Sequence, residues 1–213
     1  MTPYDILDRM TATQDEVLRE VLSRLSRPGL RVALVGGAIR DALIGRPAND
    51  LDFVVQGCSS ADELAALIGA SVRTGFNGVR ADIDGVRVDA WRCEDHHIAG
   101  GACAELDQVV ERLTLDIDRA LIILSPLRLV DAGMLDAINA RTVELCDPRG
   151  PATYAVIARA ADLIVRYDFT AGPKLRAFAA GLDHGRRGTR YVAAMLKRRG
   201  STLTPDDVWR VLA

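Results

Sequence analysis

The spacing of apolar residues near the start of the chain follows two periods in turn. A helix repeats its buried positions about every 3.6 residues, whereas a strand shows alternation or a short continuous apolar run. Breaks at Pro28-Gly29, at Gly36-Gly37 and at Pro47 separate the periodic segments. The segments predict, in order, a helix over 14–26, a strand over 31–35, a helix over 38–43, a strand over 51–55 and a helix over 59–68 capped by Ser59 or Ser60.

Strand signals return between residues 72 and 91. Asp84-Gly85 lies between two apolar segments, and this dipeptide readily adopts the positive φ that a tight hairpin requires. We therefore expect short strands over 72–74 and 79–83, and a returning strand over 86–91. Beyond them, residues 92–104 are polar and contain glycines, which predicts a loop.

The rest of the chain is predicted to be mostly helical. Helical spacing begins at Leu106, a hairpin-like passage interrupts it over 125–135, and it resumes after Pro151 through Phe178. We therefore expect an α/β (α+β) domain over 1–147, with a mixed sheet flanked by helices. A small helical portion is expected over 148–213.

Composition adds limits to this picture. The chain has 213 residues, with 27 Lys and Arg against 29 Asp and Glu and a formal net charge of −2. A protein that coats nucleic acid over its whole surface is therefore excluded, although a local basic patch is not. No apolar run approaches the length of a membrane span and the N-terminus has no signal-peptide pattern, so we expect no membrane partner and a cytoplasmic location. Scattered cysteines without a CxxC pair favour free thiols in a reducing compartment.

Three acidic residues occupy strand positions where a charge is costly. Asp50 and Asp52 flank Leu51, so in a strand both side chains point to one face, with Cα atoms roughly 6–7 Å apart. Like charges on one face repel each other unless a cation lies between them, and oxygen ligands favour Mg²⁺. Asp89, on the returning strand, is placed to complete a triad. The alternative for an isolated D-x-D, a pair of surface residues or turn acceptors, stays open.

A double glycine precedes the acidic pair. Gly36 and Gly37 end one predicted strand and begin a helix, and residues without Cβ let backbone N–H groups approach an anion such as a triphosphate. A lone Gly-Gly often marks only a sharp turn. Here twelve residues separate Gly37 from Asp50 inside a second strand, and that combination is far more specific.

Together these residues resemble the head-domain signature of the class II nucleotidyltransferases. These are the bacterial poly(A) polymerases and CCA-adding tRNA nucleotidyltransferases of the polymerase β superfamily. The resemblance covers about residues 30–175 and is densest around the double glycine and the D-x-D. It implies an α/β head followed by a helical neck, without the family's body and tail. The matching segments are 36–41, 45–47, 49–55, 88–94, 129–142 and 159–169.

The resemblance implies catalytic and metal-binding roles for the carboxylates. Asp50, Asp52 and Asp89 would hold two Mg²⁺ ions. One ion would activate a terminal hydroxyl, and the other would neutralise the triphosphate of an NTP substrate as pyrophosphate leaves.

Nucleotide-binding roles follow from the same resemblance. Gly36 and Gly37 would approach the triphosphate, Arg40 would contact a phosphate, and Asp41 would orient Arg40. An equal alternative for Asp41 is that it is simply an acid at a helix start, where the helix dipole favours a negative charge.

Two family motifs are altered in this chain. The nucleotide-handling Arg-Arg-Asp-Phe-Thr stretch corresponds to 112–116, where Arg112 is retained and Asp116 or Asp118 would stand in for the missing Asp. The base-pairing Glu-Asp-x-x-Arg of the neck falls on Ala152, Thr153 and Val156, so side chains that select C and then A are absent.

The expected function is Mg²⁺-dependent transfer of a nucleoside monophosphate from an NTP to an acceptor hydroxyl, first of all an RNA 3′ end. The RNA would be held weakly or presented by a partner protein. Two alternatives stay open: nucleotidyl transfer to a protein or small molecule, and a nucleotide-binding subunit without catalysis. A basic cluster would contact RNA phosphates or form a solvated helix face, while Tyr154 is expected in the core or at a rim. The cluster comprises Arg186, Arg187, Arg190, Lys197, Arg198 and Arg199.

Overall fold

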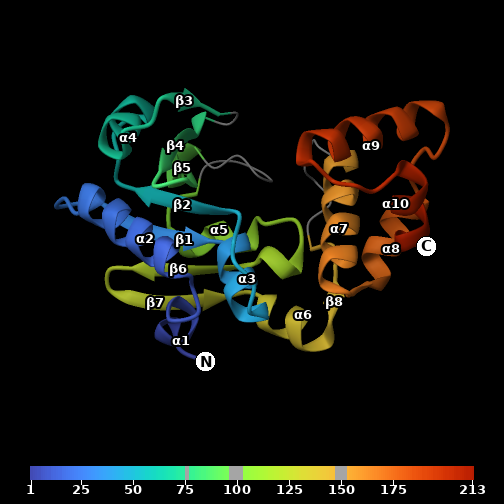
Figure 1. The fold of residues 1–213 in the computed structure, drawn as a ribbon, viewed down its shortest axis with the longest axis horizontal. Helices are drawn as coiled ribbons and strands as arrows, with labels where there is room; N and C mark the ends of the chain where they lie inside the picture. The colour runs from blue at the N-terminus through green and yellow to red at the C-terminus, as the bar shows by residue number, and fades with distance from the viewer. Residues whose placement is uncertain (75–76, 96–102, 147–152) are drawn as a thin grey trace. The chain divides into compact units, whose positions relative to one another are not determined.

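The computed structural model describes residues 1–74, 77–95, 103–146 and 153–213 (Figure 1). These residues form two compact units. The first comprises Met1–Arg112 and Asp118–Ala132, and the second Leu113–Ile117 and Gly133–Ala213. No helix among the described residues is long and apolar enough to cross a membrane.

A seven-stranded sheet forms the centre of the first unit, in the order β3-β4-β5-β2-β1-β6-β7. Only the β2–β5 pair is parallel among the ladders of this sheet, so the sheet is mixed, as predicted. The strands are β1 (Arg31–Val35), β2 (Asp50–Gln56), β3 (Val72–Arg73), β4 (Val79–Ile83), β5 (Val86–Arg92), β6 (Ala120–Leu124) and β7 (Leu127–Asp131).

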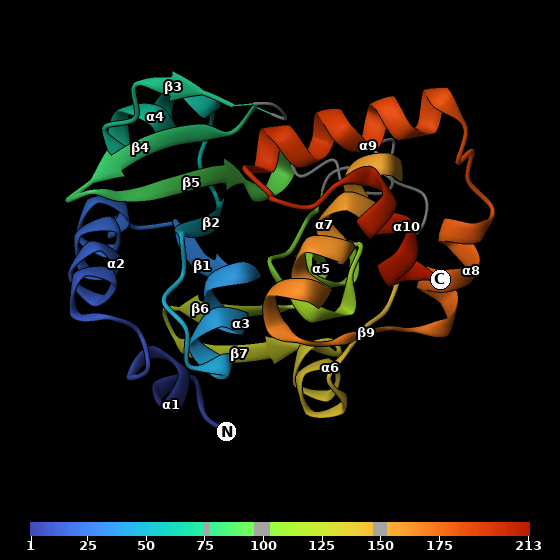
Figure 2. The same ribbon diagram turned by 45° about the vertical axis from the view of Figure 1, so that its right-hand side comes forward.

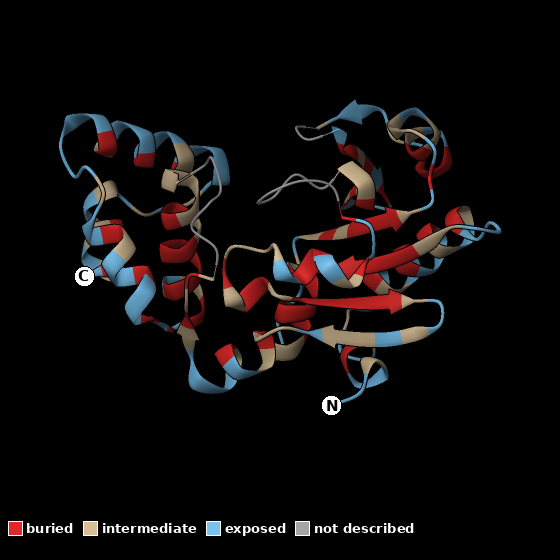
Figure 3. Ribbon diagram, turned by 180° about the vertical axis from the view of Figure 1, so that it is seen from behind, coloured by how far each residue is buried: buried red, intermediate tan, exposed pale blue. Residues whose placement is uncertain are grey.

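Five α-helices of the described residues accompany this sheet. Thr11 caps α2 in a capping box with Gln14, and Ser60, one of the two candidates, caps α4 by accepting from Glu63 N at 3.1 Å. Burial is concentrated on the central strands, whose apolar runs lie inside the unit (Figure 3). The helices are α1 (Pro3–Leu7), α2 (Ala12–Leu25), α3 (Gly37–Ile44), α4 (Ala61–Ile68) and α5 (Asp107–Glu111).

One prediction from the hydrophobic pattern is wrong. Residues 120–131 are predicted as part of a mostly helical stretch with a hairpin-like passage starting only at 125, but they form the β6–β7 hairpin. The run Ala120–Leu124 is apolar throughout, and such a run does not distinguish a buried strand from a buried helix. Pairing with β1 makes this run a strand, because the β1–β6 ladder satisfies its backbone polar groups.

The described part of the second unit is mostly helical and also contains the short parallel pair β8–β9. Helix α7 buries Ile157, Ala161 and Ile164, and it packs against α9 and α10 (Figure 2). The segment 113–117 belongs here through the Leu115–Leu145 bridge. The elements are α6 (Met134–Ala140), β8 (Thr142–Val143), α7 (Thr153–Tyr167), β9 (Thr170–Ala171), α8 (Pro173–Ala180), α9 (Arg186–Arg199) and α10 (Pro205–Leu212).

The predicted domain boundary at residue 147 lies outside the described residues. Residues 133–146, placed in the head by that prediction, group with the helices as a compact unit. As a division between a head and a neck, the boundary at 147 stays a prediction.

Candidate active site

Asp52 and Asp89 are neighbours in the sheet because β2 and β5 run parallel. Their register pairs Asp52 with Asp89, and Asp50 with Arg87. Side chains alternate between the two faces of a strand and opposed residues share a face, so Asp50, Asp52 and Asp89 lie on one face. The structure thus brings together the three carboxylates that the sequence predicts as a set.

Arginines pair with two of these carboxylates. Arg80 of β4 lies opposite Asp89 and donates from Nε to Oδ1 at 2.6 Å and from Nη2 to Oδ2 at 2.8 Å. Arg87 forms an ion pair with Asp50, and its Nε is 3.8 Å from Asp89 Oδ2. A two-point arginine pair fixes the plane of a carboxylate as well as its position.

Arg80 is influenced by all three acids. Its hydrogen bond to Asp89 is the largest cause that raises the pKa of Arg80, and the charges of Asp89, Asp50 and Asp52 raise this pKa further, against the effect of burial. A cation is therefore stabilised where these carboxylates gather. In this structure the Arg80 guanidinium is that cation.

The donor chemistry of the acidic face fits Mg²⁺, which prefers carboxylate oxygens. Within the described ranges, no three His, Cys, Asp or Glu side chains are arranged to hold one ion together. Asp50 and Asp89 are instead directed at guanidinium groups. Metal ligation by these two residues therefore requires them to exchange an arginine for the metal.

The double glycine forms the turn between β1 and α3. Gly36 has φ 68° and ψ −116°, a combination that side chains with a Cβ rarely adopt. Its N–H donates to Ala120 O at 3.0 Å, which ties the turn to β6.

This turn lies next to the face of the sheet that carries Asp50, Asp52 and Asp89. Val35, the last residue of β1, pairs with Asp52 in the antiparallel ladder. The amides of Gly37 and Ala38 come before the first hydrogen bond of α3 and have no partner within the helix. Helix N-termini with such amides favour anions, so the turn has the chemistry of a phosphate site.

Arg40 points into the protein and is only 4% exposed. Its Nε donates to Asp41 Oδ1 at 2.9 Å, and its Nη1 donates to Asp118 Oδ1 at 2.6 Å. Two buried carboxylates thus hold one buried guanidinium, and this cluster fixes the start of α3 to residue 118. The contact needed for Asp41 to orient Arg40 is present, while the phosphate role of Arg40 stays a prediction.

Arg112 and Asp116 fall in different compact units. Arg112 ends α5, and its charge and hydrogen bond lower the pKa of the Cys103 thiol against the larger raising effect of burial. Asp116 Oδ1 accepts from Ile117 N at 2.7 Å and from Glu144 N at 2.8 Å. Asp116 therefore joins the 113–117 segment to residue 144, and the nucleotide-binding roles of both residues stay predictions.

Arg80 and Arg87 are functional candidates that the sequence analysis missed, and the structure adds the pairing of Asp118 with Arg40. A signal for Arg80 exists in the sequence, because a two-residue Asp84-Gly85 turn sets the hairpin register and counting back places Arg80 opposite Asp89. The pairings of Arg87 with Asp50 and of Arg40 with Asp118 have no such signal. Arg87 meets Asp50 only because β5 lies beside β2 in the sheet. Arg40 and Asp118 are 78 residues apart along the chain.

Comparison with known proteins shows which family part of this chain resembles. Residues 32–117 match the family described as Poly A polymerase head domain. The CC-adding tRNA nucleotidyltransferase of Deinococcus radiodurans is 52% identical over 44 residues, which are 21% of this chain and 12% of that protein. The Multifunctional CCA protein of Pseudomonas fluorescens is 45% identical over 53 residues, 25% of this chain and 11% of that protein.

Solved structures show the same fold over nearly the whole chain. The Thermotoga maritima CCA-adding enzyme complexed with tRNA matches with a TM-score of 0.72 at 18% identity, over 99% of this chain and 53% of that one. A CCA-adding enzyme in complex with CTP matches with a TM-score of 0.73 at 18% identity, over 99% and 52%. The chain therefore spans about half the length of these relatives.

The matched segment contains the double glycine, the D-x-D and Asp89. It ends at residue 117, one residue before Asp118, so it covers most of the residues that build the acidic face and the glycine turn. Residues 32–117 of this chain are therefore similar to the Poly A polymerase head domain, and the chain shares the fold of CCA-adding enzymes.

Proposed function

We propose that this chain is a metal-dependent nucleotidyltransferase that moves a nucleoside monophosphate from an NTP to the terminal 3′-hydroxyl of an RNA. The observation that carries the proposal is the parallel β2–β5 register, which gives Asp50, Asp52 and Asp89 one face beside the glycine turn. The head-domain match and the fold shared with CCA-adding enzymes support this choice among nucleotidyl transfers.

Asp50, Asp52 and Asp89 would hold the metal, and Mg²⁺ when bound supplies Lewis-acid stabilisation of charge on the phosphate oxygens. The turn at Gly36 and the first amides of α3 bind the triphosphate through backbone N–H groups and the helix dipole. These groups do not reorganise during the reaction, because the glycine turn and the Arg40 cluster hold them in place.

The reaction itself is an in-line displacement. The acceptor oxygen forms a bond to the α-phosphorus, the bond from that phosphorus to the bridging oxygen breaks, and pyrophosphate leaves with the electron pair. The acceptor hydroxyl loses its proton to solvent or to a carboxylate. Positioning and electrostatic stabilisation provide most of the rate enhancement in such a step.

The acceptor in this proposal is an RNA. RNA is favoured because one matched structure is a complex with tRNA and because the second unit carries a basic helix. The RNA is bound by this chain or presented by a partner protein.

The test is label transfer by the purified protein. The protein is incubated with Mg²⁺, one labelled NTP at a time, and RNA that ends in a free 3′-hydroxyl, beside the same RNA with its 3′ end oxidised by periodate. Label on the free RNA alone, lost in the Asp50→Ala/Asp52→Ala variant, is the expected result. Label on protein, or none with any NTP, contradicts the proposal.

A further inference from the structure

We propose that the second unit binds unpaired nucleotides of an RNA strand in a pocket between the start of α7 and the exposed side of α9. The choice of RNA rests on the proposed function. The site itself rests on charge, aromatic stacking and a cavity within this unit.

The charge comes from α9, whose sequence RRGTRYVAAMLKRR contains six basic residues and no acid. Gly188, Val192 and Leu196 are its buried residues, spaced one turn apart. The basic side chains therefore emerge on the sides of the helix that solvent reaches.

The arginines at the start of α9 differ from those of the first unit. Several arginines there pair with carboxylates, as Arg80 does with Asp89 and Arg128 with Asp107.

By contrast, in the part of the chain that the structure describes, Arg186, Arg187 and Arg190 form no ion pair. Like charges three and four residues apart destabilise a helix. Such an arrangement favours a polyanionic ligand over a role in stability.

Two tyrosines form an aromatic wall beside these charges. Tyr154, in the first turn of α7, stacks on Tyr191 of α9 with ring centroids 5.4 Å apart and planes 16° apart. The Arg187 guanidinium lies 5.8 Å from the Tyr191 ring centroid. Tyr191 nonetheless stays 45% exposed, so much of its ring is open to a ligand.

Gly188 allows this stacking. A Cβ at Gly188 would lie 1.7 Å from Asp183 O and 3.3 Å from the Tyr154 ring. Only a residue without a side chain lets α9 approach so closely. Tyr154, which the sequence predicts in the core or at a rim, is thus half-buried against a neighbouring helix and lines a pocket.

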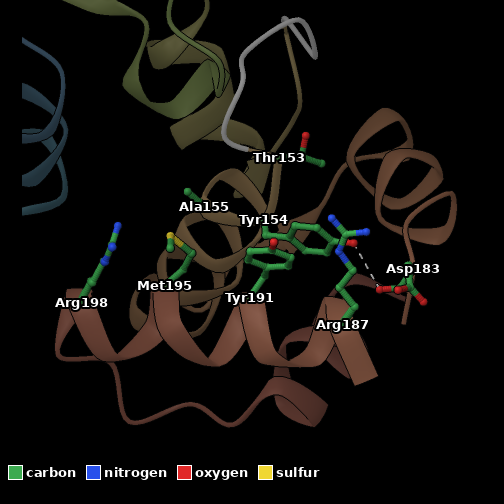
Figure 4. A pocket seen from close by; sticks show the side chains of 8 residues that line it. All are labelled: Thr153, Tyr154, Ala155, Asp183, Arg187, Tyr191, Met195 and Arg198. Carbon is green, nitrogen blue, oxygen red and sulfur yellow. Dashed lines mark hydrogen bonds between the residues drawn. The ribbon is translucent and has the colours of Figure 1, made fainter. Parts of the chain in front are cut away.

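The cavity beside the tyrosines has a volume of about 590 Å³, within the range of small-ligand sites. Figure 4 shows Arg187 at one end, Arg198 at the other and Met195 between them. The two arginines are eleven positions apart, which is about 16 Å along the helix axis. Asp183 is the acid among the lining residues, and its Oδ1 already accepts from Gly185 N at 2.8 Å.

These features select an unpaired strand. Stacking on tyrosine requires an open base face, and phosphates satisfy guanidinium groups on either side of it. A duplex hides its base faces, and an acidic peptide offers charge but no flat ring for the tyrosines. The combination is therefore specific to single-stranded nucleic acid, and the proposed function makes that strand RNA.

The test is binding of a labelled single-stranded RNA by the full chain, followed by fluorescence anisotropy without NTP or divalent metal. Tyr191→Ala is expected to weaken binding roughly 10-fold to 100-fold, whereas Tyr191→Phe, which keeps the ring, stays within about 3-fold of wild type. Arg187→Gln is expected to lower the slope of log Kd against log salt by about 0.7. Tyr4→Ala and Arg19→Ala, exposed residues of the first unit, are matched controls expected to bind like wild type.

Several outcomes overturn the pocket. They are equal binding by wild type and Tyr191→Ala, equal binding of duplex RNA of the same length, and full displacement of the RNA by a polyglutamate peptide. Circular dichroism melting checks that each variant folds. If Tyr191→Ala does not fold, the Arg187→Gln/Arg198→Gln variant replaces it in the RNA-binding assay.

The two proposals fail in different ways. If RNA binds with this dependence on Tyr191 but no NTP label is transferred, the proposed function fails and the pocket stands. If label is transferred to RNA and Tyr191→Ala leaves the KM for RNA unchanged, the pocket fails and the proposed function stands.

Discussion

Asp52 lies directly opposite Asp89 in the parallel pairing of β2 with β5. The two carboxylates are 37 positions apart in the sequence and become lateral neighbours only through strand order. Because Asp50 shares their face, a single register determines whether the chain has an acidic site or three unrelated surface acids.

The first prediction concerns this pair. Asp52→Asn and Asp89→Asn keep the size of the side chain but remove a charge, so each is expected to reduce nucleotide transfer at least about 100-fold while the protein stays folded. Label transfer to RNA measures the effect, and Asp206→Asn, an exposed acid of α10, is the control. Activity within a few-fold of wild type in both variants would show that these carboxylates are not part of the active site.

Arg80 provides a second test. Its removal leaves Asp89 without its two-point partner and beside two further negative charges, so Arg80→Ala is expected to raise the affinity for divalent metal. The measurement is the increase in Tm on adding Mg²⁺, which should exceed that of wild type. Arg73→Ala, which breaks an exposed pair with Asp62, should show the wild-type increase, and an equal increase in all three proteins contradicts the prediction.

The third prediction concerns the buried Arg40 cluster. Arg40→Ala removes the guanidinium that pairs with Asp41 and Asp118, whose side chains are 6% and 9% exposed, so we expect a loss of about 3–5 kcal/mol in the free energy of unfolding. Urea denaturation measures it. Adding Asp118→Asn to Arg40→Ala should recover part of the lost stability. If the double variant is less stable than Arg40→Ala alone, the two charges are not coupled.

A fourth prediction follows from the turn at Gly36. Its φ of 68° strains any residue with a Cβ, although a Cβ there would meet Asp118 O at an ordinary 3.6 Å. Gly36→Ala is therefore expected to cost roughly 1–3 kcal/mol of stability through backbone strain, and to weaken NTP binding by shifting the α3 amides. Gly181→Ala, at φ −78°, is the control and should change stability by less than about 0.5 kcal/mol.

The fifth prediction is a pH dependence. Burial raises the pKa of Cys93 from its ordinary 9.0 to about 12, and Cys93 has no exposed surface. Between these values the unfolded chain loses the thiol proton and the folded chain keeps it, so stability is expected to fall as pH rises from about 9 to 12.

Alkylation followed by mass spectrometry gives an independent readout. In the folded protein at pH 8, Cys146, which is partly exposed, should react with iodoacetamide before Cys93. Denaturation in urea should make the two reactivities similar. Equal labelling of Cys93 and Cys146 in the folded state would show that Cys93 is accessible.

The acidic face and the phosphate turn could both be predicted from the sequence because their signals are local. Strand periodicity alone places Asp50 and Asp52 on one face, and Gly36-Gly37 at a strand end indicates a turn that only glycine adopts freely. The strand of β6 could not be predicted in the same way, because an uninterrupted apolar run is compatible with a buried helix or a buried strand.

What the sequence by itself determined is therefore the set of chemical groups and the local geometry within each element. Only the tertiary structure decided which groups meet. It made Arg87 the partner of Asp50, paired Arg40 with Asp118, and stacked Tyr154 on Tyr191. Each of these pairs is held by strand order or helix packing between segments distant in the chain. Such contacts depend on how the whole chain buries its apolar surface, and no single segment encodes them.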